Sequence, residues 1–355
     1  NDKAIATRPG EGLPVSQLQA CLLDHLPNVS GTLKVKQFPG GYSNLTYLVS
    51  MGENEYVLRR PPVGAKVKSG HDMGREYRIL SGLKSVYQKV PTPIYYTEDL
   101  TIIGAPFYVM ERVKGVILRH GMPKDMHPEA EKMKEISTAW LDTLVELHEV
   151  DHQRAGLDDL GRPDGYIERQ ISGWGKRYYQ AKTDDLSKID FIIKWLNEQR
   201  MTSHHVSLIH NDFKYDNLIL SPDDWTTVSA VLDWEMATIG DPLMDLGTSL
   251  GYWINPGDPG DMKGLQFTPS HLPGNLTRED IIHQYELKTG RTMENPVFYY
   301  VYGLLKIAVI IQQIYYRYQQ GLTQDPRFAS LLTTIKQISI IAEQAIKRNK
   351  IDNLI

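Results

Sequence analysis

The segment from His210 to Asn217 combines residue types that could do chemistry. It reads His-Asn-Asp-Phe-Lys-Tyr-Asp-Asn, and Asp233 follows sixteen residues after Asn217. Phosphoryl transfer needs a carboxylate that orients an acceptor hydroxyl and accepts its proton, together with hard oxygen ligands that hold Mg²⁺ against phosphates. Asp212, Asn217 and Asp233 supply these groups, because a loop of the form H-x-D-x-x-x-x-N followed by a β-hairpin returns a second Asp to the same metal ions. The spacing therefore predicts a phosphoryl-transfer site.

The elements that must position these residues fall into two groups. Strand patterns occur at 33–38, 46–49 and 55–59, a helix is expected over 75–83, and two more strands are expected at 101–103 and 106–110. Beyond Gly115 the apolar spacing predicts buried helices near 136–147, 188–201 and 297–320, with short β segments at 218–220 and 229–232. We expect an α+β, two-lobed fold: residues 1–113 form a small lobe of antiparallel sheet plus a helix, and residues 114–355 form a large, mainly helical lobe.

Length, charge and cysteine usage narrow the function classes. A chain of 355 residues exceeds the usual single core, and its net charge of −4 provides no basic field for nucleic acid. Cys21 is the single cysteine, so an internal disulfide and a thiolate metal cage are excluded. The first residues lack the apolar core of a signal peptide, and the stretch 297–311 is too short to span a membrane. We therefore expect a cytoplasmic protein that binds neither nucleic acid nor membranes; its oligomeric state stays open.

Three further segments, together with the loop, resemble a known family. They are Tyr56–Pro62 (YVLRRPP), Gly161–Tyr166 (GRPDGY) and Asp233–Pro242 (DWEMATIGDP). From about Gln37 to the helices beyond residue 300, the chain is similar to the aminoglycoside and choline kinase-like phosphotransferases, which are relatives of the protein kinases. It is most similar to the branch that in some organisms is fused to acyl-CoA dehydrogenases. The resemblance implies a protein-kinase-like fold, ATP or GTP and Mg²⁺ as cofactors, and a small-molecule hydroxyl as the phosphoryl acceptor.

The resemblance also implies roles for the residues of the loop. Asp212 would be the catalytic base, and Asn217 and Asp233 would be the metal ligands. Lys214 would contact the transferred phosphoryl group, although a solvated side chain explains this lysine equally well. His210 is expected to brace the loop through hydrogen bonds rather than to react.

Four residues beyond the loop receive secondary interpretations. By the same analogy Asp245 would anchor the catalytic loop from the start of a following helix, and Asp241 would cap that helix. Trp234 and Glu235, which follow the proposed metal ligand directly, are hypothetical substrate contacts.

A glycine-containing turn in the first lobe is the candidate phosphate cover. The segment 38–47 lies between two expected strands and contains Gly41, Ser43 and Asn44. Glycine allows close backbone approach to phosphate, and the two polar side chains could donate hydrogen bonds to phosphate oxygens. Taken alone, a Gly-Gly pair between strands is an ordinary turn, so this assignment depends on the residues that follow.

A kinase-like fold also needs a cation on the third strand and an adenine-binding hinge. The third-strand position is occupied by Arg59 rather than lysine, and Glu76 on the expected helix is its natural partner. Arg60 would take this role if the strand register were shifted by one residue. The hinge would lie at the junction of the lobes, where Glu111 and Val113 offer backbone groups to a purine.

Competing hypotheses come from other functional classes. A kinase-like nucleotide-binding module without turnover is the main alternative, and Arg59 supports it. A protein kinase is disfavoured, because Asp233 runs into Gly240 within seven residues and leaves no space for an activation segment. A metalloenzyme built on the eleven histidines is also disfavoured, since the chain contains no H-E-x-x-H pattern.

Evidence on the identity of the acceptor comes only from segment 250–275, which would border the acceptor site. It carries Asp258 and Asp261 among large apolar residues, whereas an aminoglycoside site would be strongly acidic to bind a polycation. Our hypothesis is an apolar or hydroxyacyl-type acceptor, such as a hydroxyacyl thioester, rather than an aminoglycoside.

Overall fold

Contacts within the chain divide it into two units. The computed structural model describes residues 3–26, 29–39, 44–62, 71–123, 125–199, 201–259, 262, 265–323 and 325–354. Unit 1 comprises Asn1–Ile117, Asp151–Leu157 and Asn217–Met236, and unit 2 comprises Leu118–Val150, Asp158–Asp216 and Ala237–Ile355. The boundary that we predicted at 113/114 lies close to Ile117, but unit 1 also takes two later segments. One of these, Asn217–Met236, carries both predicted metal ligands.

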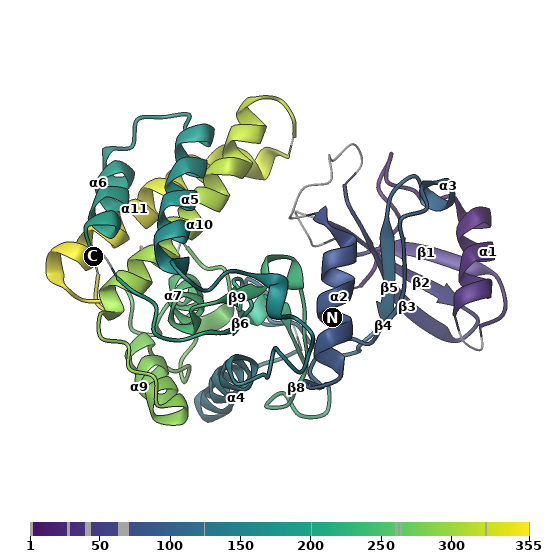
Figure 1. The fold of residues 1–355 in the computed structure, drawn as a ribbon, viewed down its shortest axis with the longest axis horizontal. Coiled ribbons are helices and arrows are strands. Elements are labelled where there is room, and N and C mark those ends of the chain that lie inside the picture. Colours follow the sequence, from purple (N-terminus) through teal and green to yellow (C-terminus); the bar gives the residue numbers. More distant parts are fainter. Residues whose placement is uncertain are drawn as a thin grey trace. The chain divides into compact units, whose positions relative to one another are not determined.

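Unit 1 is built on an antiparallel sheet, as predicted. Its strands are β1 (Leu33–Gln37), β2 (Leu45–Met51), β3 (Asn54–Arg60), β4 (Pro93–Thr97) and β5 (Phe107–Glu111), in the order β1-β2-β3-β5-β4. Helix α1 (Val15–His25) and helix α2 (Met73–Lys84) lie on opposite faces of this sheet (Figure 1). The three N-terminal strands and helix α2 agree with the sequence-based expectation.

The alternation of side chains along β3 decides which face each arginine occupies. Leu58 belongs to the apolar cluster that also contains Leu18 and Leu22 of α1. Because successive strand residues point to opposite faces, Arg59 points away from α1, toward the face covered by α2. Arg60 shares the face of Leu58, and its Nη1 donates to the carbonyl of Ile103 at 3.3 Å. The predicted register of β3 is therefore confirmed.

One predicted strand is wrong. Residues 101–103 belong to the short helix α3 (Leu100–Ile103), and the neighbouring strand is β4 instead. The side chain of Asp99 accepts a hydrogen bond from the backbone of Thr101 at 2.8 Å, and Gly104 ends the helix with φ of 75°. These two caps make a helical turn from residues whose β-branched side chains favour a strand.

A β-hairpin completes unit 1. Strands β7 (Leu218–Leu220) and β8 (Val228–Val231) pair antiparallel, and Leu220 also forms an isolated bridge with Val116. The backbone of Leu232 donates to the carbonyl of Asn217 at 2.8 Å. The hairpin thus holds the residue before Asp233 beside Asn217.

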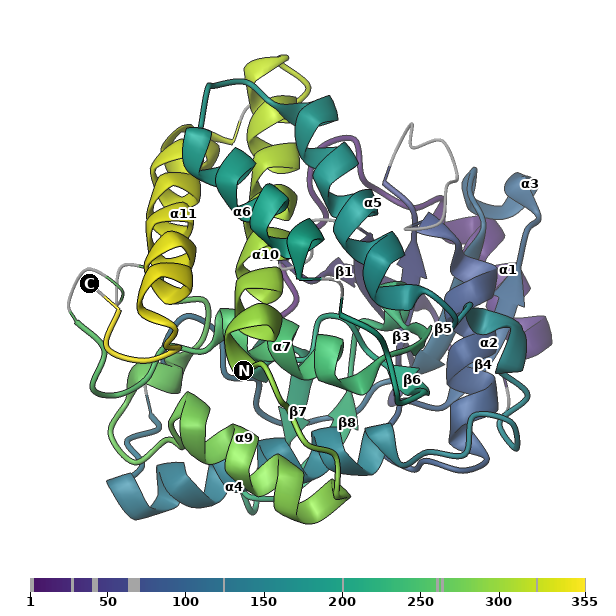
Figure 2. The same ribbon diagram turned by 60° about the vertical axis from the view of Figure 1, so that its left-hand side comes forward.

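Unit 2 is mainly helical, as predicted. Its helices are α4 (Ala130–His148), α5 (Tyr166–Ala181), α6 (Ser187–Glu198), α7 (Pro242–Tyr252), α9 (Arg278–Thr289), α10 (Pro296–Gln319) and α11 (Leu331–Arg348). Strands β6 (Ser207–Ile209) and β9 (Thr238–Gly240) form a short ladder. Helices α5, α6 and α11 lie alongside α10, as Figures 1 and 2 both show. The loop that precedes Asp212 follows directly from β6.

Helix α10 is the central element of unit 2. It contacts α7 so closely that a Cβ atom at Gly303 would lie 2.2 Å from the carbonyl oxygen of Gly247. Among the described residues α10 is the one helix long and apolar enough to cross a membrane, but 83% of its apolar window is buried in the protein. Such burial is typical of a core helix.

Candidate active site

The loop of unit 2 that contains Asp212 is anchored by Asp245, as the sequence predicted. This carboxylate accepts hydrogen bonds from the backbone of His210 at 2.7 Å and of Asn211 at 2.8 Å. Burial alone would raise the pKa of Asp245, but hydrogen bonding to His148 and nearby positive charge hold this pKa below its ordinary value. Asp241 caps α7 by accepting from the backbone of Leu243 at 2.7 Å, which was also predicted. The loop is therefore bound to the first turn of α7.

His210 braces the loop from within. Its Nδ1 accepts a hydrogen bond from the backbone of Asp212 at 3.2 Å, and its side chain is fully buried. The predicted structural role of His210 is thus confirmed. Because Nδ1 accepts, this ring nitrogen carries no proton.

Asp212 and Lys214 form an ion pair. Lys214 Nζ lies 2.9 Å from Asp212 Oδ2 and 4.7 Å from the centre of the Tyr252 ring. Burial would raise the pKa of Asp212, but Lys214 outweighs it and the pKa lies below its ordinary value. Burial would likewise lower the pKa of Lys214, and Asp212 reverses the sign. Asp212 is therefore a carboxylate at neutral pH and able to accept a proton, and Lys214 is not a freely solvated side chain.

The predicted metal ligands lie in unit 1, at the open end of the β7–β8 hairpin. Asn217 precedes β7, and Asp233 follows β8 with a left-handed φ of 67°. Asp233 stays about one-third exposed, with 33% of its side-chain surface accessible. An amide and a carboxylate are hard oxygen donors of the kind that Mg²⁺ prefers. The donor set therefore fits a magnesium ion, although the described residues contain no group of three or more His, Cys, Asp or Glu side chains that could hold a metal.

Arg59 is the centre of a carboxylate cluster in unit 1. Its Nη2 lies 2.9 Å from Asp233 Oδ1, 3.4 Å from Glu76 Oε1 and 3.9 Å from Glu235 Oε2. The expected ion pair between Arg59 and Glu76 is thus confirmed. The contact with Asp233 was not expected, and it brings the strand arginine to a predicted metal ligand.

The electrostatics of the Arg59 cluster are dominated by burial. Burial raises the pKa of Glu76, and Arg59 only partly opposes this effect. For Arg59 burial alone would lower the pKa, but Glu76 and the other acidic neighbours outweigh it, so the guanidinium stays charged. The three carboxylates outnumber Arg59 and the neighbouring Arg75, whose Nη1 donates to the backbone carbonyl of Glu235 at 3.2 Å, so the cluster can accommodate a further cation.

Asn44 ties the end of the glycine turn to this cluster. Its Nδ2 donates to Glu235 Oε2 at 2.8 Å, and its Oδ1 lies 2.9 Å from His71 Nδ1. The predicted phosphate-cover residues Gly41 and Ser43 lie outside the described residues. Asn44 itself is buried and bonded to protein, so its side chain serves to position Glu235.

Glu111 and Val113 differ in what their backbones can offer a nucleotide. Glu111 ends β5, its backbone N–H donates to the carbonyl of Thr92 at 2.8 Å, and its side chain accepts from Thr92 Oγ1 at 2.6 Å. Within the described part of the chain, no hydrogen bond involves the backbone of Val113. Val113 is therefore the better candidate for a hinge donor.

Two interpretations from the sequence change with the structure. Trp234 was taken as a substrate contact, but it is 1% exposed and its Nε1 donates to the carbonyl of Val231 at 2.9 Å, so that hypothesis is wrong. Asp258, one of two acidic candidates near the acceptor, is buried in an ion pair with Arg278 at 2.9 Å. Asp261 lies outside the described residues.

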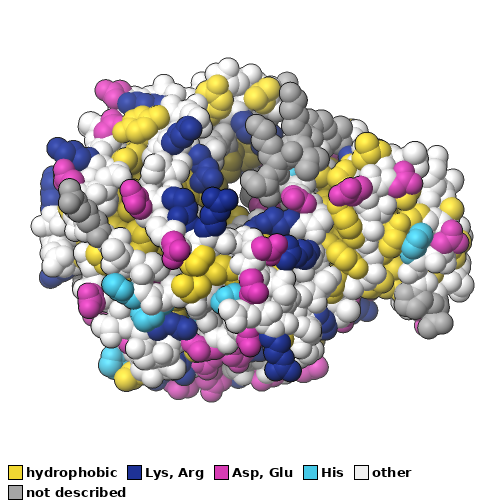
Figure 3. Space-filling view, in the orientation of Figure 1, with side chains coloured by type: hydrophobic (Ala, Val, Ile, Leu, Met, Phe, Trp, Pro, Cys, Tyr) yellow, Lys and Arg dark blue, Asp and Glu magenta, His cyan; other side chains and the backbone are white. Residues whose placement is uncertain are grey.

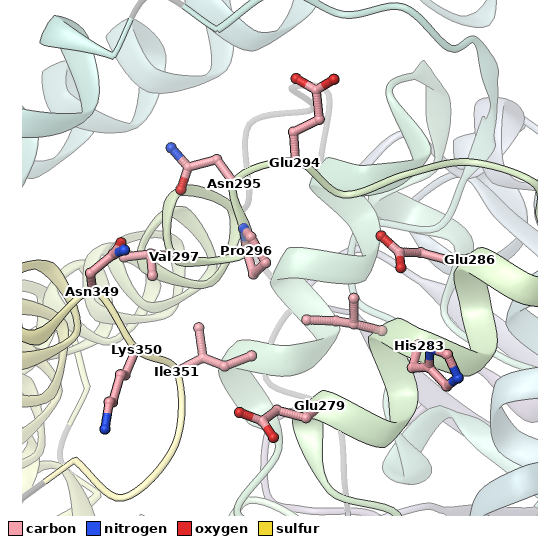
Figure 4. A pocket seen from close by; sticks show the side chains of 11 residues that line it. Glu279, His283, Glu286, Glu294, Asn295, Pro296, Val297, Asn349, Lys350 and Ile351 are labelled. Atoms are coloured by element: carbon pink, nitrogen blue, oxygen red, sulfur yellow. The ribbon is translucent and has the colours of Figure 1, made fainter.

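A separate hollow of about 530 Å³ opens elsewhere in unit 2 (Figure 4). It lies between α9, the start of α10 and the C-terminal segment, and Figure 4 shows Glu279, Glu286 and Glu294 around it. None of the predicted site residues lines this hollow. It is therefore a different feature from the loop that contains Asp212.

An antiparallel five-stranded sheet with α2, a clamped Asp loop and an Arg–Glu pair together define a kinase-like phosphotransferase. Residues 34–274 match the phosphotransferase enzyme family known as APH. The chain belongs to this family.

Curated relatives refine this placement. The chain is 34% identical over 294 residues to acyl-CoA dehydrogenase family member 10 from Mus musculus, covering 82% of this chain and 27% of that protein. It is 32% identical over 334 residues to family member 11 from Gallus gallus, covering 93% of this chain and 42% of that protein. The chain thus spans well under half the length of these two relatives. The predicted likeness to the branch linked to acyl-CoA dehydrogenases is confirmed.

Solved structures agree on the fold. A Ralstonia eutropha protein provisionally named an aminoglycoside phosphotransferase superposes with a TM-score of 0.79 at 28% identity, covering 95% of this chain and 99% of that one. Choline kinase from Cryptosporidium parvum superposes with a TM-score of 0.62 at 14% identity, covering 91% and 92%. An aminoglycoside phosphotransferase solved with GDP and kanamycin gives 0.60 at 16%, covering 90% and 97%. The last two show likeness of fold alone.

Proposed function

We propose that this protein transfers the γ-phosphoryl group of ATP or GTP to a hydroxyl group of a small molecule. The observation that carries the proposal is Asp212, a carboxylate held at 2.9 Å by Lys214 on a loop bound to Asp245. Asp212 orients the acceptor hydroxyl and takes its proton, and Lys214 contacts the transferred phosphoryl group. Membership of the phosphotransferase family supports the reaction class.

Nucleotide and metal are assigned to residues of unit 1. Asn217 and Asp233 would hold Mg²⁺, which neutralises phosphate charge when bound. Arg59, positioned by Glu76, would contact the nucleotide phosphates, while Val113 would donate to the purine. The fold neighbour solved with GDP supports nucleotide use. A cytoplasmic location is part of this proposal.

The acceptor is proposed to be an anionic hydroxyacyl compound, such as a hydroxyacyl thioester, rather than an aminoglycoside. Asp258 forms an ion pair with Arg278, so its carboxylate is not available to a polycationic acceptor. Basic side chains gather over α5 in Figure 3, and among the described residues neither Lys176 nor Arg177 of this helix forms an ion pair with an acidic residue. The names of the acyl-CoA dehydrogenase relatives point to the same class of compound.

A second candidate function is a nucleotide-binding module without turnover. The contact of Arg59 with Asp233 at 2.9 Å favours it, because a guanidinium on a metal ligand competes with the metal. Both functions include nucleotide binding, so only phosphoryl transfer distinguishes them.

The test is transfer from γ-labelled ATP with Mg²⁺ to a panel of hydroxyacyl thioesters and aminoglycosides, with wild type beside Asp212→Asn. We expect labelled hydroxyacyl product and a loss of turnover of about 10²–10⁴-fold in the variant. Labelled product with aminoglycosides but not with hydroxyacyl thioesters would refute the proposed acceptor class. Nucleotide binding without transfer to any acceptor or to water would favour the binding module.

A further inference from the structure

The residue before the proposed catalytic base has a left-handed backbone conformation. Asn211 has φ of 67°, a value that non-glycine residues seldom adopt and that Asn and Asp tolerate best. Such conformations persist only where surrounding contacts impose them. At Asn211 this conformation sets the direction in which the chain enters Asp212.

The contacts that impose this conformation come from three helices of unit 2. Asp245 of α7 accepts from the backbone N–H of Asn211 at 2.8 Å. Tyr166 of α5 accepts from Asn211 Nδ2 at 3.3 Å. Lys306 of α10 donates from Nζ to the backbone carbonyl of Asn211 at 2.6 Å and to its side-chain oxygen at 3.1 Å. Lys306 therefore binds both the peptide group and the side chain of this residue.

Lys306 is an unusual residue for its position. It is 1% exposed in a helix whose neighbouring residues Leu304, Leu305 and Ile307 are also buried. In the described ranges no other lysine is buried to this degree. Burying an ammonium group is costly unless hydrogen bonds and opposite charge compensate. Nothing in the packing of an apolar core helix requires this charge, so its contacts with Asn211 account for its presence.

We propose that Lys306 is a positioning residue of the phosphotransferase reaction. Its ammonium group holds the Asn211 peptide in the left-handed conformation and thereby fixes the direction from which Asp212 meets the acceptor. This inference rests on the proposed function, because Asp212 is its point of action.

The charge on Lys306 is set by several groups around it. Burial, reinforced by the positive charges of Arg177 and Lys214 and opposed by the attraction of Asp245 and Asp212, lowers the pKa of Lys306 to about 8. The ring of Trp174 on α5 lies 5.7 Å from Nζ. His148, which contacts Asp245, and His210 also lie in this network.

The test compares Lys306→Met and Lys306→Gln with Gln312→Met. Gln312 is a matched control, because it is a buried polar residue of the same helix that donates to Ala181 at 2.8 Å and to Thr183 at 2.9 Å instead of the loop. We would measure thermal unfolding, kcat, the KM for ATP, and the pH dependence of kcat on purified full chains. Amide hydrogen exchange at residues 210–213 would be measured on the same samples.

If Lys306 positions the loop, Lys306→Met lowers kcat by about 10–100-fold, leaves KM for ATP within about twofold, and speeds exchange at 210–213. Lys306→Gln, which keeps a hydrogen-bond donor, recovers part of this loss. In wild type kcat falls as pH rises through about 8, where Lys306 loses its proton, and this fall is absent in Lys306→Met. Gln312→Met changes thermal stability without changing kcat.

Kinetics of Lys306→Met equal to those of wild type, with wild type active, would overturn the positioning role and leave the proposed function standing. If wild type transfers no phosphate to any acceptor, the proposed function fails and the positioning role in that reaction fails with it. Unchanged exchange at 210–213 in Lys306→Met would overturn the positioning role even with wild type active, because Lys306 would then not order the loop.

Discussion

Replacing Arg59 by Met tests the carboxylate cluster of unit 1. The substitution keeps an unbranched apolar side chain but removes the cation that Glu76, Asp233 and Glu235 share. Glu76 is 2% exposed, so without Arg59 it must either stay charged and unpaired or take up a proton.

The magnitude follows from the geometry. A pair of unit charges at the 3.4 Å separation of Arg59 and Glu76 interacts by about 5 kcal/mol at an effective dielectric constant of about 20. Removing one partner of a buried pair costs about 3–5 kcal/mol. We therefore expect Arg59→Met to lower the free energy of unfolding by about 3–5 kcal/mol at pH 8. The pKa of Glu76 is already raised in the folded protein, and losing Arg59 raises it further, so the deficit shrinks as pH falls and Glu76 becomes protonated.

The assay is urea unfolding at pH 5.5 and pH 8. Arg60→Met is the matched control, because Arg60 is also buried on β3 but, among the described residues, its side chain donates to the carbonyls of Pro61 and Ile103 and forms no ion pair. Its deficit should not depend on pH. The double variant Arg59→Met with Glu76→Gln should be more stable than Arg59→Met alone. Equal stabilities of the single and double variants, or a deficit for Arg59→Met that is no larger at pH 8 than at pH 5.5, would refute the assigned role of Arg59.

Two more variants separate metal binding from loop anchoring. Asp233→Asn should abolish the Mg²⁺ dependence of nucleotide binding, measured by calorimetric titration with and without the metal; an unchanged dependence would contradict the metal assignment. Asp245→Asn should lower the free energy of unfolding at pH 7 by about 2–3 kcal/mol, because an amide nitrogen would face one of the donors that the carboxylate now accepts from. The pKa of Asp245 is lowered on folding, so wild type loses this contribution as pH falls below the ordinary value of 3.8, whereas Asp245→Asn has no such contribution to lose.

Local pattern was sufficient to predict much of the fold. The alternation of β1, the β-prone residues of β2 and β3 and the apolar stripe of α4 are encoded by neighbouring residues, and these elements were predicted. A strand was predicted where α3 lies, because the residues between Asp99 and Gly104 have high β propensity. The caps that these two residues supply outweigh that propensity and favour a helical turn. Strand β4 was missed because prolines at positions 91 and 93 interrupt its pattern.

The candidate site likewise has residues that local sequence could predict and residues that it could not. The spacing of Asp212, Asn217 and Asp233 follows from a loop and a hairpin that are continuous in the chain, so sequence alone could propose them. Lys306 is 95 residues from its partner Asn211, and no local periodicity distinguishes a lysine that binds a loop from one that interrupts an apolar helix. The only available signal was a charge within the apolar stretch 297–311.

The distribution of charge indicates where a further cation is needed. On the loop of unit 2, Asp212 is paired with Lys214 at 2.9 Å and Asp216 with Arg119 at 2.6 Å. Asp245 is satisfied by backbone and histidine donors.

In unit 1 Arg59 faces Glu76, Asp233 and Glu235, and Asp233 is the most exposed of these three carboxylates. Arg75 lies beside the same cluster and donates to the backbone carbonyl of Glu235 at 3.2 Å. A divalent ion at Asp233 would neutralise the excess that Arg59 cannot, and it would do so without disturbing an ion pair of the loop. If Arg59 stays paired with Glu76 and leaves Asp233, it and the proposed metal ion have complementary roles. If Arg59 stays paired with Asp233, it competes with the metal ion for this carboxylate.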